Sequence, residues 1–212
     1  MTHRVAVLIS GSGTNLQALI DHSQRTDCLA EIAVVVSNRA NVRGLERARA
    51  AGIDAVWMDH RGKARTAYDQ ELVERLKHYD VDWVFLAGFM RLLSPVFLDA
   101  FPGRVINIHP ALLPSFPGLN AQQQAFEAGV QVSGATVHFV DPGMDTGAII
   151  AQGSIRRKSG DSIDAFSARI LAMEHRLFPM VMRWATEGRL SLRDGVAVVE
   201  LAEDESRVLA AD

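Results

Sequence analysis

An amide, an imidazole and a carboxylate stand at positions where they could act together on a carbonyl carbon. Asn107 and His109 lie in the apolar run that begins at Val105, and side chains two residues apart on a strand point to one face. The turn-rich stretch after Val140 offers Asp145 as a third group. An amide and a protonated imidazole stabilise an oxyanion, and a nearby carboxylate favours the charged imidazole. We therefore expect acyl-type chemistry, with Asn107, His109 and Asp145 as catalytic candidates.

The same residues also have a purely structural interpretation. A histidine before a proline, as in His109-Pro110, often has a structural role at the end of a strand. The aspartates and glycines of 141–147 are also the residues that build turns. Residue spacing alone therefore leaves both interpretations open.

A glycine-rich loop follows the first expected strand. Gly11 and Gly13 let the backbone approach an anion, and the N-terminus of the next helix favours a phosphate. A dinucleotide site would have a third glycine in place of Leu16 and an acidic residue in place of Ser37-Asn38. The lysine of a nucleoside triphosphate loop is also missing. The loop therefore predicts either a tight turn without a ligand or a site for a mononucleotide or sugar phosphate.

The elements that position these residues alternate between strands and helices. The expected strands are 4–9, 31–36, 55–58, 83–86 and 105–108, and the expected helices are 15–22, 42–51, 64–78 and 95–100. This alternation is typical of an α/β fold, Rossmann-like, with a mostly parallel sheet covered by helices on both faces. Ligands bind at the carboxyl ends of such strands, so the glycine loop and Asn107 to His109 are expected on one rim.

The pattern changes after Pro110. A short helix over 121–128 is followed by strands 133–140 and 147–152, and the lack of a helix between these strands predicts an antiparallel edge. Asp161 and Ser162 precede a long helix, and a hairpin is expected over 190–199. We expect the last residues to be frayed.

The composition fits one compact domain over 1–212. The chain has 212 residues, of which 48% are hydrophobic, enough for a sizeable core. A formal net charge of -3 gives no bulk attraction to nucleic acid or to an anionic membrane. No stretch approaches the ~20 apolar residues of a membrane span. We therefore expect small-molecule partners, and the single Cys28 favours a reducing cytoplasm.

The histidines do not form a metal-binding pattern. No two of them stand at the spacing of metal ligands, so we predict no metal. His138 lies inside an expected strand, and His175 lies beside Glu174 on an expected helix. We interpret both histidines as packing residues or hydrogen-bonded support.

Nearly the whole chain resembles the phosphoribosylglycinamide formyltransferases, folate-dependent enzymes of purine biosynthesis. The segments that carry the resemblance are VLISGSGTNLQALI, VSNRANVRGLERARAAGI, VFLAGFMRLLSP, NIHPALLPSFPGL, GATVHFVDPGMDTGAIIAQ and MEHRLFP. The wider group of folate formyltransferases shares NIHPALLP and DTGAII, whereas SGSGTNL and the colinearity of the chain point to the purine enzymes.

The resemblance implies a formyltransferase fold and a reaction. A formyl group would pass from 10-formyltetrahydrofolate, the co-substrate, to the amine of glycinamide ribonucleotide. Asn107 and protonated His109 would stabilise the tetrahedral intermediate, and Asp145 would support His109 and assist proton movement.

The resemblance also assigns binding residues. Gly13, Thr14 and Asn15 would hold the substrate phosphate, and Glu174 would reach the glycinamide end. The residues expected to contact the folate are Arg65, Met90, Arg91, Leu92, Leu93, Asn107, Val140 and Asp141. The chain would then be a single formyltransferase domain with a phosphate-binding N-terminal half and a folate-binding, catalytic C-terminal half. It would act in the cytoplasm as a monomer or homodimer.

One departure from the family and three rival functions stay open. Asn120 stands where the family often carries a histidine, so an auxiliary proton transfer there is in doubt. A formyltransferase acting on initiator methionyl-tRNA would be expected to have a further C-terminal domain and a basic surface. A hydrolase that releases formate from the same folate usually has an N-terminal regulatory domain. A silent nucleotide-binding module would leave Asn107, His109 and Asp145 without a role.

Overall fold

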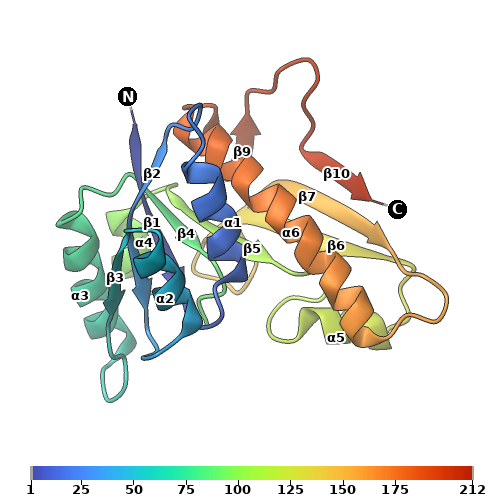
Figure 1. Ribbon diagram of the computed structural model, residues 1–212, viewed down its shortest axis with the longest axis horizontal. Helices are drawn as coiled ribbons and strands as arrows, with labels where there is room; N and C mark the ends of the chain where they lie inside the picture. Colours follow the sequence, from blue (N-terminus) through green and yellow to red (C-terminus); the bar gives the residue numbers. More distant parts are fainter. Residues whose placement is uncertain (1, 212) are drawn as a thin grey trace. The chain divides into compact units, whose positions relative to one another are not determined.

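The computed structural model describes residues 2–211, which fall into two compact units divided between Asn107 and Ile108 (Figure 1). Strands of the first unit are β1 (His3–Ile9), β2 (Ala30–Ser37), β3 (Asp54–Trp57), β4 (Trp83–Leu86) and β5 (Val105–His109), the last of which runs into the second unit. Its helices are α1 (Thr14–Ser23), α2 (Arg43–Ala50), α3 (Arg65–Lys77) and α4 (Pro95–Ala100).

All strand pairs of the first unit are parallel, in the order β5-β4-β1-β2-β3. The chain moves outward from β1 to β3 and then returns to β4 and β5 on the other side of β1. Right-handed crossovers therefore place α1 and α2 on one face and α3 and α4 on the other. The contacts within each of these helix pairs agree with this arrangement. The loops after β1 and β4 consequently leave the sheet at the point where the strand order reverses, which is where ligands bind in such sheets.

Burial explains why the strands of this unit were visible in the sequence. Val5, Ala6, Val7, Leu8 and Ile9 of β1 are all 0% exposed, because helices cover both faces of the central strand. A strand buried on both sides must be a continuous apolar run, and that run is the pattern by which it was predicted.

The second unit contains α5 (Ala121–Glu127), β6 (Val132–Phe139), β7 (Ile149–Arg156), α6 (Ile163–Thr186), β8 (Leu190–Arg193), β9 (Val196–Val199) and β10 (Val208–Ala211). The strands β6 and β7 are antiparallel, and α6 packs on both of them. The Ser162 hydroxyl caps α6 by accepting the Ala165 N–H at 3.1 Å. Close packing at the sheet depends on Gly153, where an added Cβ would lie 2.4 Å from the Met173 side chain.

The α/β fold class is confirmed, including the mostly parallel strands and the antiparallel pair. One detail is wrong: the tail that we expected to be frayed forms β10, which pairs in parallel with β7. The Arg207 guanidinium donates to the carbonyls of Ile149 and Ile150, each at 2.6 Å, and so holds β10 on β7. No helix within residues 2–211 is both long and apolar enough to cross a membrane.

Glu205 is expected to make the stability of the second unit depend on pH. Hydrogen bonds from Arg189, from the Ala202 N–H and from Trp184 outweigh burial and lower the pKa of Glu205 to about 2. A carboxyl group whose pKa is lowered by folding stabilises the fold at pH values above its pKa in the unfolded chain. This stabilisation is lost as the pH falls toward 2. We expect Glu205→Gln to lower the free energy of unfolding by about 1 to 2 kcal/mol at pH 7. Urea titrations should show the difference shrinking between about pH 4.5 and pH 2, whereas a pH-independent difference would contradict the assignment.

Candidate active site

Gly13 sets the shape of the loop after β1. It adopts φ 70 directly before α1, and an added Cβ would lie 2.7 Å from the Cα of Gly44. The Gly44 N–H donates to the Gly11 carbonyl at 3.1 Å. Both the left-handed backbone and the close contact therefore require glycine at position 13. Thr14 and Asn15, the other residues expected to hold a phosphate, form the start of α1, and the positive end of a helix dipole attracts anions.

Two residues of α2 that were not predicted as functional support this loop. The Arg47 guanidinium donates to the Ser12 carbonyl and to the Gln17 side chain, each at 3.0 Å. At Gly44, an added Cβ would lie 2.3 Å from the Ile9 side chain. A glycine inside a helical pattern often has a packing reason, and this signal was available in the sequence. The loop is thus held rigidly by the neighbouring helix.

The segment expected to contact folate follows β4. Met90 and Leu92 are 55% and 48% exposed, whereas Leu93 is 5% exposed and belongs to the core. The Arg91 guanidinium lies over the Tyr68 ring, 4.7 Å from its centroid. The segment therefore presents two apolar side chains to solvent, as a wall for a flat ring would. Arg65, expected at the glutamate tail, is exposed at the start of α3.

The structure brings Asp145 to His109. β5 carries Asn107 and His109 two residues apart, hence on one face. The His109 ring is buried, and its Nδ1 lies 3.3 Å from Oδ2 of Asp145. The Asp145 side chain is 13% exposed and that of His109 is 5% exposed, so the carboxylate is the more accessible partner.

The turn between β6 and β7 holds Asp145 in place. Asp145 adopts φ 57, which is sparsely populated for residues other than glycine. Its Oδ2 accepts the Gly118 N–H at 2.8 Å, and its Oδ1 lies 3.7 Å from Nε2 of the buried His138. The Asp141 carboxylate accepts from the Gly143 N–H and the Thr146 hydroxyl, so this predicted folate residue also shapes the turn. Val140, predicted with it, is half-buried after β6.

The loop after β5 fixes the other side of the His109 ring. The Phe116 carbonyl lies 2.8 Å from His109 Nε2. The buried Thr136 hydroxyl on β6 donates to the Ala111 carbonyl at 2.7 Å and accepts the Leu113 N–H at 3.0 Å. A side chain of the sheet therefore fixes the first part of the loop that carries Phe116.

The charge of His109 differs from our expectation. Burial lowers the pKa of His109, the Phe116 carbonyl and the Asp145 carboxylate raise it, and the result lies below the ordinary value of 6.5. Asp145 acts in the expected direction but burial outweighs it, so the imidazole is not held charged near neutral pH. Burial raises the pKa of Asp145, yet His138, the Gly118 N–H and the charges of both imidazoles bring it below its usual value.

This geometry is suited to taking up one proton. Both ring nitrogens of His109 face acceptors, the Phe116 carbonyl and the Asp145 carboxylate. A neutral ring has one N–H and can satisfy only one of them, whereas the imidazolium satisfies both. The buried pair can therefore accept a proton during a reaction and hold the resulting cation beside a carboxylate.

Two further predicted positions lie elsewhere in the second unit. Glu174, expected at the glycinamide end, is 5% exposed on α6. Asn120, which stands in place of a family histidine, is exposed and precedes α5 with φ 55. The left-handed backbone at this position is one that asparagine adopts readily.

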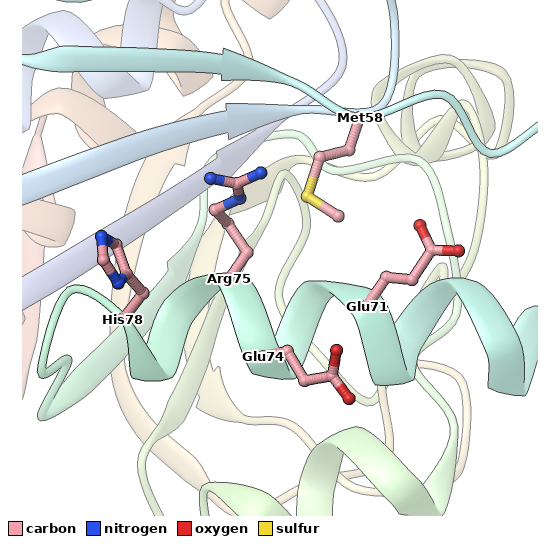
Figure 2. A pocket seen from close by; sticks show the side chains of 5 residues that line it. All are labelled: Met58, Glu71, Glu74, Arg75 and His78. Carbon is pink, nitrogen blue, oxygen red and sulfur yellow. The ribbon is translucent and has the colours of Figure 1, made fainter.

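A groove of about 360 Å³ lies in the first unit. The residues that line it are Met58, then Glu71, Glu74 and Arg75 of α3, and His78, which directly follows α3 (Figure 2). It contains none of the predicted site residues, and its charges are mixed. Within residues 2–211, no group of three or more His, Cys, Asp or Glu side chains is arranged to hold a metal ion.

Comparison with known proteins identifies the family. Residues 3–182 match the family described as Formyl transferase. The phosphoribosylglycinamide formyltransferase of Escherichia coli (strain K12) is 43% identical over 194 residues, which are 91% of this chain and 92% of that protein. The crystal structure of glycinamide ribonucleotide transformylase 1 from Symbiobacterium toebii is 51% identical, with a TM-score of 0.90 over 93% of this chain and 94% of that chain.

Longer proteins also contain a region similar to this chain. The trifunctional purine biosynthetic protein adenosine-3 of Bos taurus is 45% identical over 202 residues, which are 95% of this chain and 20% of that protein. The chain thus spans about a fifth of the length of that curated relative. Because the family match covers most of the chain and the bacterial relative is matched along nearly all of its length, this chain belongs to the formyl transferase family, among the phosphoribosylglycinamide formyltransferases.

Proposed function

We propose that this chain transfers the formyl group of 10-formyltetrahydrofolate to the amine of glycinamide ribonucleotide in purine biosynthesis. The observation that carries the proposal is the buried His109 and Asp145 pair, 3.3 Å apart, in a member of this family. The amine nitrogen attacks the formyl carbon, and the carbonyl oxygen becomes an oxyanion. Cleavage of the bond to the folate nitrogen then releases tetrahydrofolate. The amine loses one proton and the folate nitrogen gains one.

Three residues have different roles in this reaction: Asn107, His109 and Asp145. The Asn107 amide donates to the oxyanion, and a fixed donor of this kind contributes about 3 to 4 kcal/mol in comparable acyl-transfer sites. The His109 and Asp145 pair takes up the amine proton and returns it to the folate nitrogen. Asp145 is the more accessible member, so the proton enters through the carboxylate and the imidazolium then forms beside the oxyanion. His138 steadies the Asp145 carboxylate from its other oxygen.

The binding residues follow from the same proposal. Gly13, Thr14 and Asn15 hold the substrate phosphate, and Glu174 contacts the glycinamide end. The folate lies against the Met90 to Leu93 segment and the 140–145 turn, with Arg65 toward its glutamate tail. We further infer that both units form one formyltransferase domain that works without a metal, as a cytoplasmic monomer or homodimer on small-molecule substrates.

One assay tests the reaction. Purified protein is incubated with 10-formyltetrahydrofolate, with and without glycinamide ribonucleotide, and tetrahydrofolate and formate are followed. We expect tetrahydrofolate to appear only with the acceptor and without free formate. Acceptor-independent formate release would favour a hydrolase, and absence of turnover would contradict the proposal.

Gly13→Ala is expected to weaken binding of glycinamide ribonucleotide. The new methyl group would meet the Gly44 backbone, and alanine is strained at φ 70. Steady-state kinetics should show a KM for this substrate raised at least about tenfold, equivalent to about 1.4 kcal/mol. Gly188→Ala is the matched control, because Gly188 has φ 75 but nothing within 4 Å of an added Cβ. It should lower stability without changing KM, and an equal change in KM would refute the assignment of the loop.

A further inference from the structure

The segment 88–94, which carries the proposed folate wall, has no regular structure of its own. It lies between β4 and α4, and its exposed Met90 and Leu92 side chains cannot anchor it. Its conformation must therefore be set by contacts with other elements.

A buried hydroxyl fixes the start of this segment. The Met90 N–H donates to Oγ of Ser10 at 2.8 Å, and the Ser10 hydroxyl donates to Oδ1 of Asn38 at 2.6 Å. Ser10 and Asn38 are each 3% exposed. The hydroxyl oxygen therefore accepts from the Met90 backbone, while the hydroxyl proton is directed to the Asn38 amide oxygen. Asn38 thus faces inward, toward Ser10, at the position where a dinucleotide site would have an acidic residue.

The far end of the segment has a separate anchor. The Ser94 N–H donates to Oδ2 of Asp69 at 2.6 Å, and both residues are 0% exposed. Arg91 stacks on Tyr68 between the two ends. Loss of the Ser10 hydroxyl therefore removes the hydrogen bond that fixes the Met90 backbone next to the buried Phe89, while the anchor at Ser94 stays in place.

The phosphate loop does not depend on the Ser10 hydroxyl. Although Ser10 directly precedes this loop, the Gly11 carbonyl is held by the Gly44 N–H and the Ser12 carbonyl by Arg47. Removal of the hydroxyl should therefore affect one substrate and spare the other.

We propose that Ser10, oriented by Asn38, is a positioning residue for the folate co-substrate, which it serves by fixing the backbone of Met90. This inference rests on the proposed function. Ser10 does not touch the reacting atoms, so it acts on folate binding and leaves the chemical step unchanged.

The inference is tested with the variant Ser10→Ala, and Ser37→Ala is its matched control. Ser37 is also a buried serine at the carboxyl end of a strand, but its hydroxyl bonds only the Arg39 backbone. Ser10→Ala leaves the Met90 N–H and the Asn38 amide oxygen without their partner. We expect the KM for 10-formyltetrahydrofolate to rise about 5- to 30-fold. The kcat and the KM for glycinamide ribonucleotide should stay within about twofold, and Ser37→Ala should change none of the three.

Two readouts other than activity complete the test. Hydrogen exchange at the Met90 amide should accelerate in Ser10→Ala and stay unchanged in Ser37→Ala. The Kd of tetrahydrofolate, measured by calorimetry, should rise in parallel with the KM. If Ser10→Ala does not fold, Asn38→Ala keeps the hydroxyl but removes its acceptor, and a rise in folate KM of about threefold is expected.

The outcomes separate this inference from the proposed function. A wild-type protein without formyl transfer would overturn the proposed reaction. Hydrogen exchange at the Met90 amide and the Kd of tetrahydrofolate would still show whether the Ser10 hydroxyl fixes the Met90 backbone. A wild-type protein that is active, together with Ser10→Ala indistinguishable from Ser37→Ala, would overturn the inference alone. Equal increases in KM for both substrates would also overturn it, because they would indicate a general loss of structure.

Discussion

Replacing His109 by asparagine is expected to lower kcat by about 100- to 10,000-fold, the range that loss of a proton-transferring group typically produces. Asparagine can place its amide N–H near the position of Nδ1, beside the Asp145 carboxylate, but it is too short to reach the Phe116 carbonyl, which lies 2.8 Å from Nε2 of the imidazole. It cannot take up a proton beside Asp145. Both KM values should change only a few-fold, because the reaction is impaired and the binding segments are not. Single-turnover kinetics with saturating substrates measure the chemical step directly.

The fold of this variant must be checked separately, since His109 is 4% exposed and its loss leaves buried partners. Circular dichroism and the urea midpoint should show a folded protein with about 1 to 3 kcal/mol less stability. His109→Ala removes the remaining N–H as well and should lie at or below the asparagine variant in activity. Near-wild-type turnover in either folded variant would show that His109 is not the proton-transferring group.

Much of the fold could be predicted because local pattern and tertiary burial agree. The strand from Val5 to Ile9 is buried on both faces and reads as an uninterrupted apolar run. Ser162 was visible as a cap for α6, and its side chain does accept the Ala165 N–H. By contrast, β10 depends on contacts distant in sequence. The Arg207 guanidinium donates to the Ile149 and Ile150 carbonyls, and no local sequence pattern around the tail predicts these two hydrogen bonds.

The residue types of the site could be predicted from the sequence. The contacts between them and the direction of the His109 pKa shift could not. Asn107 and His109 were placed by strand periodicity, whereas the contact between His109 and Asp145 depends on the conformation of the turn after β6. His138 lies near Asp145 in a strand whose register with β7 shifts between Val137 and His138. Such an irregularity changes the direction in which the side chains point, and the sequence pattern does not predict it. The pKa of His109 likewise depends on burial, which outweighs the carboxylate.

Ser10 and Asn38 illustrate the same limit. Their contact requires the ends of β1 and β2 to be neighbours in register, and Ile9 does pair with Ser37. In the sequence, Ser37-Asn38 argues only against a dinucleotide site, because a missing acidic residue is visible there and the inward orientation of an amide is not.

The second large effect is expected for Asp145→Asn, which separates the charge of the carboxylate from its shape. Asparagine retains an oxygen for the Gly118 N–H, so the turn can keep its conformation. It loses the negative charge that stabilises the imidazolium, and we expect kcat to fall about 100- to 1,000-fold. A folded variant with wild-type kcat would contradict the role of the carboxylate.

The pH profile of Asp145→Asn gives a directional test. His109 must be neutral to accept the amine proton, so kcat/KM of the wild-type enzyme should fall as the pH drops through the His109 pKa, which lies below 6.5. Asp145 raises that pKa, and its removal should lower it further. In Asp145→Asn, the fall of kcat/KM at acid pH should therefore occur at a lower pH than in the wild type. The pH-independent value of kcat/KM should also be smaller. Direct titration of the His109 ring by NMR should show the same shift. A fall of kcat/KM that stays at the same pH or moves to higher pH would show that the Asp145 charge does not act through His109.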